Sequence, residues 1–399
     1  MKKDATGGSL GHGAARLALL AFLWITGCGL WLSAEEPGDP LTIGRTVKLH
    51  SAALGEDRTV LVTTPAGYEQ GARKYPVVYV LDGETNHLLS AAVTNFFWQN
   101  GQMPPVIVVS VTNTDRTRDF TPTAVADRPG SGGGPKFMEF LKKELLPFVE
   151  KNYRTLDYRI LIGHSLCGMY AVYSLLSEPD LFQALIAISP YVMYDNDYVV
   201  RLAEERLPGM SDRKRFLYVT LGNEPEYNAS IDRLLGLLKK KGPKSLEVHF
   251  DPMKTENHGT VRLKSVYQGM EALFAGWRLP DDLAALGLAG IRKHFEGLSA
   301  RFGYPVDVPE AALNQLGYQL LNRKRGGDAI EVFRKNIELF PESANVYDSL
   351  GEALEQAGKL EEARENYRQA VARAEKTQDR NLPVFRQHLS GVEAKLKNK

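Results

Sequence analysis

Ser165 lies in the sequence Gly163-His164-Ser165-Leu166-Cys167-Gly168, where a serine hydroxyl could act as a nucleophile. An apolar, strand-like run ends at Ile162 and a helix-like segment begins at Leu166, so the serine falls on the turn between them. Such a turn presents a hydroxyl above a sheet edge and beside a helix amino terminus. Cys167 stands where the Gly-x-Ser-x-Gly motif has its second glycine, but cysteine is small enough for the turn. The pattern predicts a nucleophile at Ser165; a structural turn and a Cys167 thiol nucleophile are the alternatives.

A serine nucleophile needs a general base, and in this strand–turn–helix arrangement the acid and then the histidine follow the serine along the chain. Four histidines follow Ser165. His258 lies in the turn-forming segment KTENHGT, between the last strand-like run and the helix after it, which is where this arrangement carries its base. The others are expected to be structural, because His249 lies inside a strand-like run and His294 and His388 lie in a helical region.

The acid of such a triad is expected on the loop after the strand-like run FLYVTLG, where NEPE supplies Glu224 and Glu226. A carboxylate there would hold the imidazole in one tautomer and stabilise the imidazolium. Glu224 is preferred because it is nearer the strand end, and Glu226 is the alternative. The developing oxyanion would be bound by the backbone N–H of Leu166 and by a second N–H after the strand PVVYVLDG, at Gly83 or Glu84.

Two arginines follow a further strand-like run, PPVIVVSVTNT. Arg116 and Arg118 could bind an anionic substrate, or they could form local ion pairs with Asp119 that hold the loop. No His-Glu-x-x-His or comparable metal-ligand spacing occurs. The two cysteines, Cys28 and Cys167, supply neither a disulfide framework nor a zinc site. We therefore expect chemistry without a metal or other cofactor.

The elements that must position these residues alternate between strands and helices from residue 41 to residue 279. VKLHSAAL and RTVLVTTP predict a strand pair, and later runs such as PVVYVLDG are apolar throughout, which is typical of strands buried on both faces of a mostly parallel sheet. Apolar residues recur at helical spacing over 137–153. Further helices are expected from residue 166, over 230–240 and over 261–277. The alternation predicts a doubly wound α/β sheet.

A sequence repeat with a constant offset begins near residue 309. The matching positions are Leu313 and Tyr347, Leu316-Gly317 and Leu350-Gly351, Ala329 and Ala363, and Phe333 and Tyr367. Their offset is the tetratricopeptide period, in which each unit is a helix pair that must stack on its neighbours. Helices over 289–301 and 383–397 are expected to complete the stack. The sequence predicts a connecting helix within 280–308 and a small all-α domain over 309–399.

Residues 41–279 resemble the esterase D and enterochelin-esterase branch of the α/β hydrolases. The matching stretches, in order, are PVVYVLDGE, VTNTDRTRDFTP, GSGGGPKFMEFLKKELLPFVEKNY, IGHSLCGMYAVYSLLSEPDLFQALIAISP, LGNEPE and ENHGT. The resemblance implies Ser165 as nucleophile, His258 as base and Glu224 as acid, in a branch that typically has Gly or Ala at the Cys167 position. Its members hydrolyse carboxylic esters, including siderophore trilactones and thioesters, and close relatives are acyltransferases.

The leading hypothesis is therefore a serine esterase that acts on a small-molecule ester through an acyl-enzyme. One alternative is an acyltransferase that uses the same triad. Another is a catalytically silent scaffold that binds a protein or peptide partner through its repeats. The formal net charge of +1 gives no electrostatic reason to expect nucleic acid as a partner.

The amino-terminal segment predicts export. Lys2, Lys3 and Arg16 precede an uncharged stretch over 17–34 that ends in small residues, as a secretory signal does. A lipoprotein signal with a lipidated Cys28 and an uncleaved membrane anchor are the alternatives. All three place the body outside the cytoplasm, periplasmic or secreted, with membrane contact through an anchor or a lipid.

Overall fold

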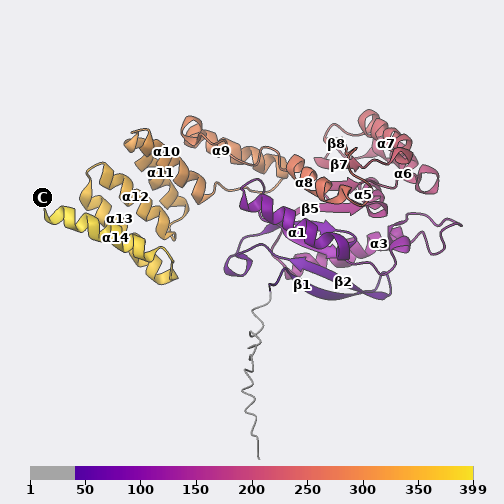
Figure 1. The fold of residues 1–399 in the computed structure, drawn as a ribbon, viewed down its shortest axis with the longest axis horizontal. Helices are drawn as coiled ribbons and strands as arrows, with labels where there is room; N and C mark the ends of the chain where they lie inside the picture. Colours follow the sequence, from indigo (N-terminus) through magenta and orange to yellow (C-terminus); the bar gives the residue numbers. More distant parts are fainter. Residues whose placement is uncertain (1–40, 399) are drawn as a thin grey trace, which may run out of the picture. The chain divides into compact units, whose positions relative to one another are not determined.

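The computed structural model describes residues 41–398, and the predicted signal, its cleavage site and Cys28 lie outside them (Figure 1). The chain from Ile43 onward forms one compact unit. Among the helices between residues 41 and 398, none combines the length and the apolarity that crossing a bilayer requires.

An eight-stranded sheet forms the first part of this unit. Its strands lie in the order β1-β2-β4-β3-β5-β6-β7-β8. β2 is antiparallel to both of its neighbours, and every other neighbouring pair is parallel. The bounds are β1 Arg45–Ser51, β2 Glu56–Thr63, β3 Tyr75–Val80, β4 Ile107–Val111, β5 Thr155–His164, β6 Ala184–Ile188, β7 Arg215–Leu221 and β8 Leu246–Pro252. The predicted mostly parallel sheet, with its antiparallel strand pair, is confirmed.

Helices cover both faces of the sheet, which explains why the central strands are apolar throughout. In β3, Val77 and Tyr79 belong to one buried cluster, whereas Val78 and Val80 belong to the other. The first cluster is completed by α3 (Gly134–Phe140), α4 (Leu146–Asn152), α5 (Leu166–Ser177), α6 (Tyr194–Arg206) and α7 (Asn228–Lys241). The second includes α1 (Gly83–Gln99) and α8 (Val261–Leu273) and continues into the helices that follow residue 282.

The helix predicted over 137–153 is divided by one wider turn. A π-helical segment, η2 (Leu141–Leu145), separates α3 from α4. Pro147 follows immediately, and proline has no N–H to donate to a carbonyl one turn earlier. The amide of Leu146 donates instead to the carbonyl of Leu141, five residues back, which accommodates the proline without ending the helical path.

Helices alone form the rest of the chain (Figure 1). They are α9 (Leu283–Phe302), α10 (Glu310–Asn322), α11 (Gly326–Leu339), α12 (Ala344–Gln356), α13 (Leu360–Thr377) and α14 (Leu382–Lys397). A Cβ added at Gly317 would lie 2.4 Å from the ring of Phe333, and one added at Gly351 would lie 2.7 Å from the ring of Tyr367. The constant offset of the repeat thus has a physical cause, because each glycine lets an aromatic ring of the paired helix approach the backbone.

Candidate active site

Ser165 occupies a sharp turn between β5 and α5. Its backbone is held at φ 61° and ψ −118°, a conformation that costs a non-glycine residue free energy and recurs at functional sites. The Ser165 amide donates to the carbonyl of Ile188 at 2.9 Å, and its carbonyl accepts from the amide of Tyr191 at 3.1 Å. A Cβ added at Gly163 would lie 2.1 Å from the carbonyl oxygen of Cys167. The turn therefore requires glycine at residue 163 and presents Ser165 at the edge of the sheet.

The Cys167 side chain is completely buried at the start of α5. Burial, and then the negative charge of Asp82, raise the pKa of its thiol well above the ordinary value. Since the thiolate is the nucleophilic form of cysteine, this environment disfavours Cys167 as a nucleophile.

His258 and Glu224 meet at the same sheet edge. Glu224 lies just after β7 and is 6% exposed. One of its carboxylate oxygens accepts a hydrogen bond from His258 Nδ1, and the other accepts from the Ser189 hydroxyl at 2.5 Å. The Ser189 oxygen also accepts from the amide of Gly222 at 3.1 Å, so both carboxylate oxygens are fixed. Glu226 is exposed and has no such contact.

His164, the residue before Ser165, connects the nucleophile turn to His258. Its Nε2 donates to the carbonyl of His258 at 2.7 Å, and the two ring centroids are 4.5 Å apart. Burial, and then the nearby His258, lower the pKa of His164 to about 4. His164 is therefore neutral at pH 7 and adds no positive charge beside His258. Within residues 41–398 no hydrogen bond joins the Ser165 hydroxyl to the His258 ring, and the contact between the Ser165 turn and His258 is made by His164.

Three backbone amides are free for an oxyanion at this edge. Gly83 and Glu84 begin α1 and Leu166 begins α5, and the first N–H groups of a helix have no acceptor within it. Within residues 41–398, no other group accepts a hydrogen bond from these amides. A Cβ added at Gly83 would lie 2.9 Å from the carbonyl oxygen of Val111, so glycine lets this loop lie against β4.

An ion pair ties the Gly83 loop to the nucleophile turn. Asp82 precedes α1 with φ 53° and is 6% exposed. Arg116, at the start of α2 (Arg116–Phe120), donates to its two carboxylate oxygens at 2.8 and 3.0 Å and to the carbonyl of His164 at 3.2 Å. Asn113 donates to Asp82 at 2.8 Å. Burial raises the pKa of Asp82, but the hydrogen bonds and the positive charge of Arg116, together with the hydrogen bond from Asn113, outweigh it and hold the pKa below its ordinary value.

Arg118 belongs to a different ion-pair network. It donates to Glu56 at 2.6 and 3.0 Å and to Asp119 at 2.7 Å. The fully buried Arg58 contacts the same two carboxylates. The hydrogen bonds from Arg118 lower the pKa of Glu56 to about 2. This is the loop-holding ion pair that the sequence offered as the alternative to substrate binding.

The other candidate histidines have structural partners elsewhere. His249 contacts Glu247 at 2.7 Å within β8. His294 Nε2 donates to the carbonyl of Trp277 at 3.1 Å, and His388 pairs with Asp348 at 2.9 Å.

Aromatic rings and an arginine line one side of the Ser165 edge. The Tyr227 ring lies 6.1 Å from the His258 ring and 5.6 Å from the Tyr191 ring, between centroids. The Arg128 guanidinium lies 5.2 Å from the Tyr191 ring, and within the described residues no carboxylate pairs with it. Burial, and then the charge of Glu224, raise the pKa of Tyr227 to about 12. The wall formed by Tyr191, Tyr227 and Arg128 therefore offers flat apolar surface ending in a positive charge.

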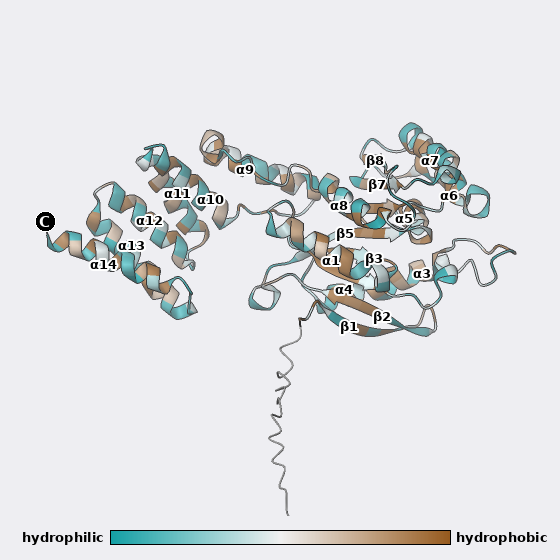
Figure 2. Ribbon diagram, viewed as in Figure 1, coloured by the Kyte–Doolittle hydropathy of each residue, from teal (hydrophilic) through white to brown (hydrophobic). Residues whose placement is uncertain are grey.

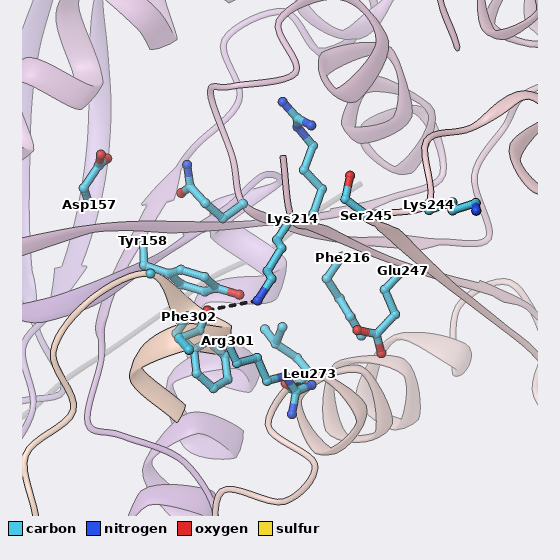
Figure 3. Close-up of a pocket in the computed structure, with 14 residues that line it drawn as sticks. Asp157, Tyr158, Lys214, Phe216, Lys244, Ser245, Glu247, Leu273, Arg301 and Phe302 are labelled. Atoms are coloured by element: carbon cyan, nitrogen blue, oxygen red, sulfur yellow. Dashed lines mark hydrogen bonds between the residues drawn. The ribbon is translucent and has the colours of Figure 1, made fainter. Parts of the chain in front are cut away.

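A large cavity of about 720 Å³ lies elsewhere, and Figure 3 shows its lining. Lys214 and Ser245 at its edge precede β7 and β8, whereas Glu224 and His258 follow these strands. Because β7 and β8 are parallel, the cavity lies at the opposite edge of the sheet from Ser165.

Sequence analysis did not identify several residues that hold the site. Ser189 is followed by Pro190 at the end of an apolar run, and Asp82 lies between another strand end and Gly83. Both positions have positive φ. A polar residue at the end of a buried parallel strand was a usable signal for both. The contacts of His164 and Arg128 had no comparable signal, because they depend on how distant loops meet.

Comparisons with known proteins find similarity in two regions of the chain. Residues 51–239 match a family model described as "Putative esterase", and residues 309–376 match a tetratricopeptide repeat model. A crystal structure of an IroE-like serine hydrolase from Shewanella oneidensis is 27% identical, covering 74% of this chain and 99% of that one, with a TM-score of 0.66.

Two curated relatives are siderophore esterases by name. The ferri-bacillibactin esterase BesA of Bacillus subtilis is 30% identical over 151 residues, 32% of this chain and 51% of the relative. The siderophore triacetylfusarinine C esterase of Aspergillus fumigatus is 25% identical over 160 residues, 36% of this chain and 54% of the relative. The chain thus spans about half the length of these relatives. The first part of the protein accordingly has an α/β-hydrolase fold and is similar to siderophore esterases, and helices that match a tetratricopeptide repeat model follow it in the same chain.

Proposed function

We propose that this protein is an exported serine hydrolase that cleaves carboxylic esters through an acyl-enzyme. The observation that carries the proposal is the fixed pair of His258 and Glu224 beside the strained turn at Ser165. Ser165 is the proposed nucleophile, His258 the general base and Glu224 the acid that orients it.

The hydrogen bonds assign a task to each side chain. Glu224 accepts from His258 Nδ1, so Nε2 of the same ring is left to receive a proton. In acylation, Ser165 Oγ forms a bond to the ester carbonyl carbon while its proton passes to His258 Nε2. The resulting oxyanion accepts from the amide of Leu166 and from that of Gly83 or Glu84.

Collapse of the tetrahedral intermediate breaks the bond to the alcohol oxygen, which takes the proton from His258. Water then repeats the sequence: it gives a proton to His258, attacks the acyl carbon and releases the free acid with Ser165 restored. The neutral His164 holds the carbonyl of His258 throughout, without opposing the positive charge that forms on the His258 ring.

For the substrate, we propose an ester with a flat, anionic acyl or alcohol group. The wall of Tyr191 and Tyr227 suits an aromatic ring, and Arg128, which donates to the Tyr191 hydroxyl at 3.2 Å but pairs with no carboxylate of the described residues, suits a negative charge on it. Siderophore esters are the first class to test, because two relatives are named for hydrolysing them.

We also propose the domain limits and location expected from the sequence. The hydrolase domain covers 41–279, a connecting helix lies within 280–308 and the repeats cover 309–399. The uncharged segment over 17–34 supports export to the periplasm or beyond. The repeats are proposed to contact a protein or peptide partner.

The decisive experiment is labelling of residues 35–399 by a fluorophosphonate probe, followed by peptide mapping. We expect modification at Ser165 and hydrolysis of p-nitrophenyl acetate, both abolished in Ser165→Ala and His258→Ala. Cys167→Ala is the matched control and is expected to keep labelling, which would exclude the thiol. Folded wild-type protein that neither labels nor hydrolyses would overturn the proposal in favour of a scaffold. Free acid as sole product, with alcohols added, would separate hydrolysis from acyl transfer.

A further inference from the structure

The outer side of α1 has an unusual composition for a surface helix. Glu84, in its first turn, is the single Asp, Glu, Lys or Arg among its 17 residues. Its inner side packs on the sheet, yet the opposite side leaves Leu88 60% exposed and Phe96 50% exposed. Figure 2 shows strongly hydrophobic residues along this helix. The solvent-facing side of a surface helix is normally polar or charged, so Leu88 and Phe96, exposed on the same side as Thr85, Asn95 and Gln99, form an apolar patch without cover.

The exposed apolar surface continues onto α8. The Phe96 ring lies 6.3 Å from the ring of Tyr267, between centroids. Leu263, one turn before Tyr267 on the same helix, is 57% exposed. Arg262 and Lys264 flank this leucine.

The surface also continues onto the segment that precedes β1. Ile43 is 49% exposed. It lines an apolar cavity of about 220 Å³ together with Leu88 and the partly buried Trp98. We call Ile43, Leu88, Phe96 and Leu263 the α1–α8 face.

This clustering differs from ordinary exposure of single apolar residues, which needs no explanation. Between residues 41 and 398, eight large hydrophobic side chains are exposed, and four of them form the α1–α8 face. Leu339 on α11 and Val384 on α14 have similar exposure but lie on separate helices of the repeat domain. They provide matched controls.

Charge and chain length together identify what covers the face. Arg262 pairs with no carboxylate in the described part of the chain. The Lys264 ammonium lies 3.9 Å from a Glu256 carboxylate oxygen, which is a weak ion pair. Leucine and phenylalanine bordered by basic residues and tryptophan are the composition that binds the interface of an anionic bilayer.

The predicted signal segment supplies the second argument. Eight residues separate Ala34, the end of the uncharged stretch, from Ile43. Fully extended, they reach at most about 28 Å. If that stretch stays in a membrane, Ile43 of the α1–α8 face is held within this distance of the end of the stretch.

We propose that the α1–α8 face docks on the surface of a phospholipid bilayer containing anionic lipids. Both helices start at the catalytic edge: Gly83 is the first residue of α1, and Val261 follows His258 by three residues. Docking therefore places the mouth of the site beside the interface, where esters that partition into membranes are concentrated.

The test is co-sedimentation of residues 35–399 with mixed vesicles of phosphatidylcholine and the anionic lipid phosphatidylglycerol. Residues 35–399 contain the whole compact unit that begins at Ile43. They lack the uncharged segment over 17–34, so that segment cannot contribute to the binding measured. We expect binding that is weaker on pure phosphatidylcholine. Trp277→Phe leaves Trp98 as the sole tryptophan of residues 35–399, and its emission should shift to shorter wavelength on binding.

The variant Leu88→Glu/Phe96→Glu/Leu263→Glu should bind at least about tenfold more weakly, since it removes apolar area and adds negative charge. Leu339→Glu/Val384→Glu should bind as wild type does. Labelling at Ser165 and the circular dichroism spectrum check that each variant is folded. Absence of wild-type binding, or equal binding by the first variant, would overturn the proposal. A dimer, detected by light scattering and lost in the first variant, would show that a second copy covers the face and would also overturn it.

Discussion

Arg116 and Arg118 lie two residues apart on α2, and their different partners make a sharp test of the proposed site. Arg116 joins Asp82, which precedes the Gly83 and Glu84 amides, to the carbonyl of His164, which precedes the nucleophile. Arg118 contacts carboxylates outside the site. Replacing each arginine by glutamine removes one positive charge from the same helix.

For Arg116→Gln, the Asp82 carboxylate stays 6% exposed and keeps its hydrogen bond from Asn113. Breaking a fully buried ion pair costs about 3–5 kcal/mol of folding free energy. The Arg116 side chain is 34% exposed, so water can replace part of the interaction. We therefore expect a loss of about 2 kcal/mol. Displacing an oxyanion donor lowers kcat by about 100-fold or more. We expect a loss of this size for Arg116→Gln, with little change in KM.

For Arg118→Gln, both carboxylates keep Arg58 as a partner. The expected loss of stability is about 1 kcal/mol, with kcat within about twofold of wild type. Arg116→Lys separates positioning from stability. Its ammonium restores the charge beside Asp82 but cannot reproduce the planar fork that also reaches His164, so stability should recover more than kcat.

The measurements are urea unfolding followed by circular dichroism, and kcat and KM on p-nitrophenyl acetate. If Arg116→Gln lost stability as predicted but kept wild-type kcat, the contacts of Arg116 with Asp82 and His164 would be structural only. The Gly83 and Glu84 amides would then not form the oxyanion site. If Arg118→Gln lowered kcat equally, the effect would belong to the whole α2 loop.

Three further predictions test other contacts. Glu224→Gln should lower kcat by about 10³- to 10⁴-fold, while Glu226→Gln stays within about twofold; equal losses would reject the choice of acid. Because the pKa of His164 is lowered to about 4 from 6.5, the unfolded chain binds more protons in that interval, and stability should fall by about 2 kcal/mol from pH 7 to pH 5. Urea titrations should show a smaller fall in His164→Asn, and an unchanged fall would assign it to other groups. Gly351→Ala, which places a Cβ 2.7 Å from the Tyr367 ring, should lower the melting temperature measured by calorimetry, and Gly351→Ala/Tyr367→Leu should recover part of the loss.

The sheet could be predicted from the sequence because burial on two faces leaves a direct pattern. Runs such as Val77–Val80 are apolar at every position since both neighbouring layers are helices. The tetratricopeptide pairing could be predicted because one steric requirement, a glycine beneath an aromatic ring, recurs once in each repeat. The π turn at η2 could not be predicted from periodicity, since it widens a single turn and leaves the apolar spacing nearly intact.

Some features of the candidate site could likewise be predicted from the sequence, and others could not. Residues that follow strands could be assigned to one edge, because parallel strands end together, and this reasoning predicts that Ser165, Glu224 and His258 lie at the same edge. Which partner each loop residue selects could not be predicted. Arg116 and Arg118 look equivalent in RTRDF, but they point into separate networks because a five-residue helix turns successive side chains to different sides.

The proposed oxyanion site lies at the first residues of α1 and α5, which explains why few residue types in the sequence indicate it. The groups proposed to bind the oxyanion are backbone amides, which every residue except proline carries, so their positions leave no compositional trace. The sequence does show the residues that the backbone conformation of these turns requires. Gly163 and Gly83 are required where a Cβ would meet backbone atoms, and Asp82, Ser165 and Ser189 take positive φ at neighbouring strand ends. Strained polar residues at the ends of β3, β5 and β6 are therefore the most specific sequence mark of the proposed active site.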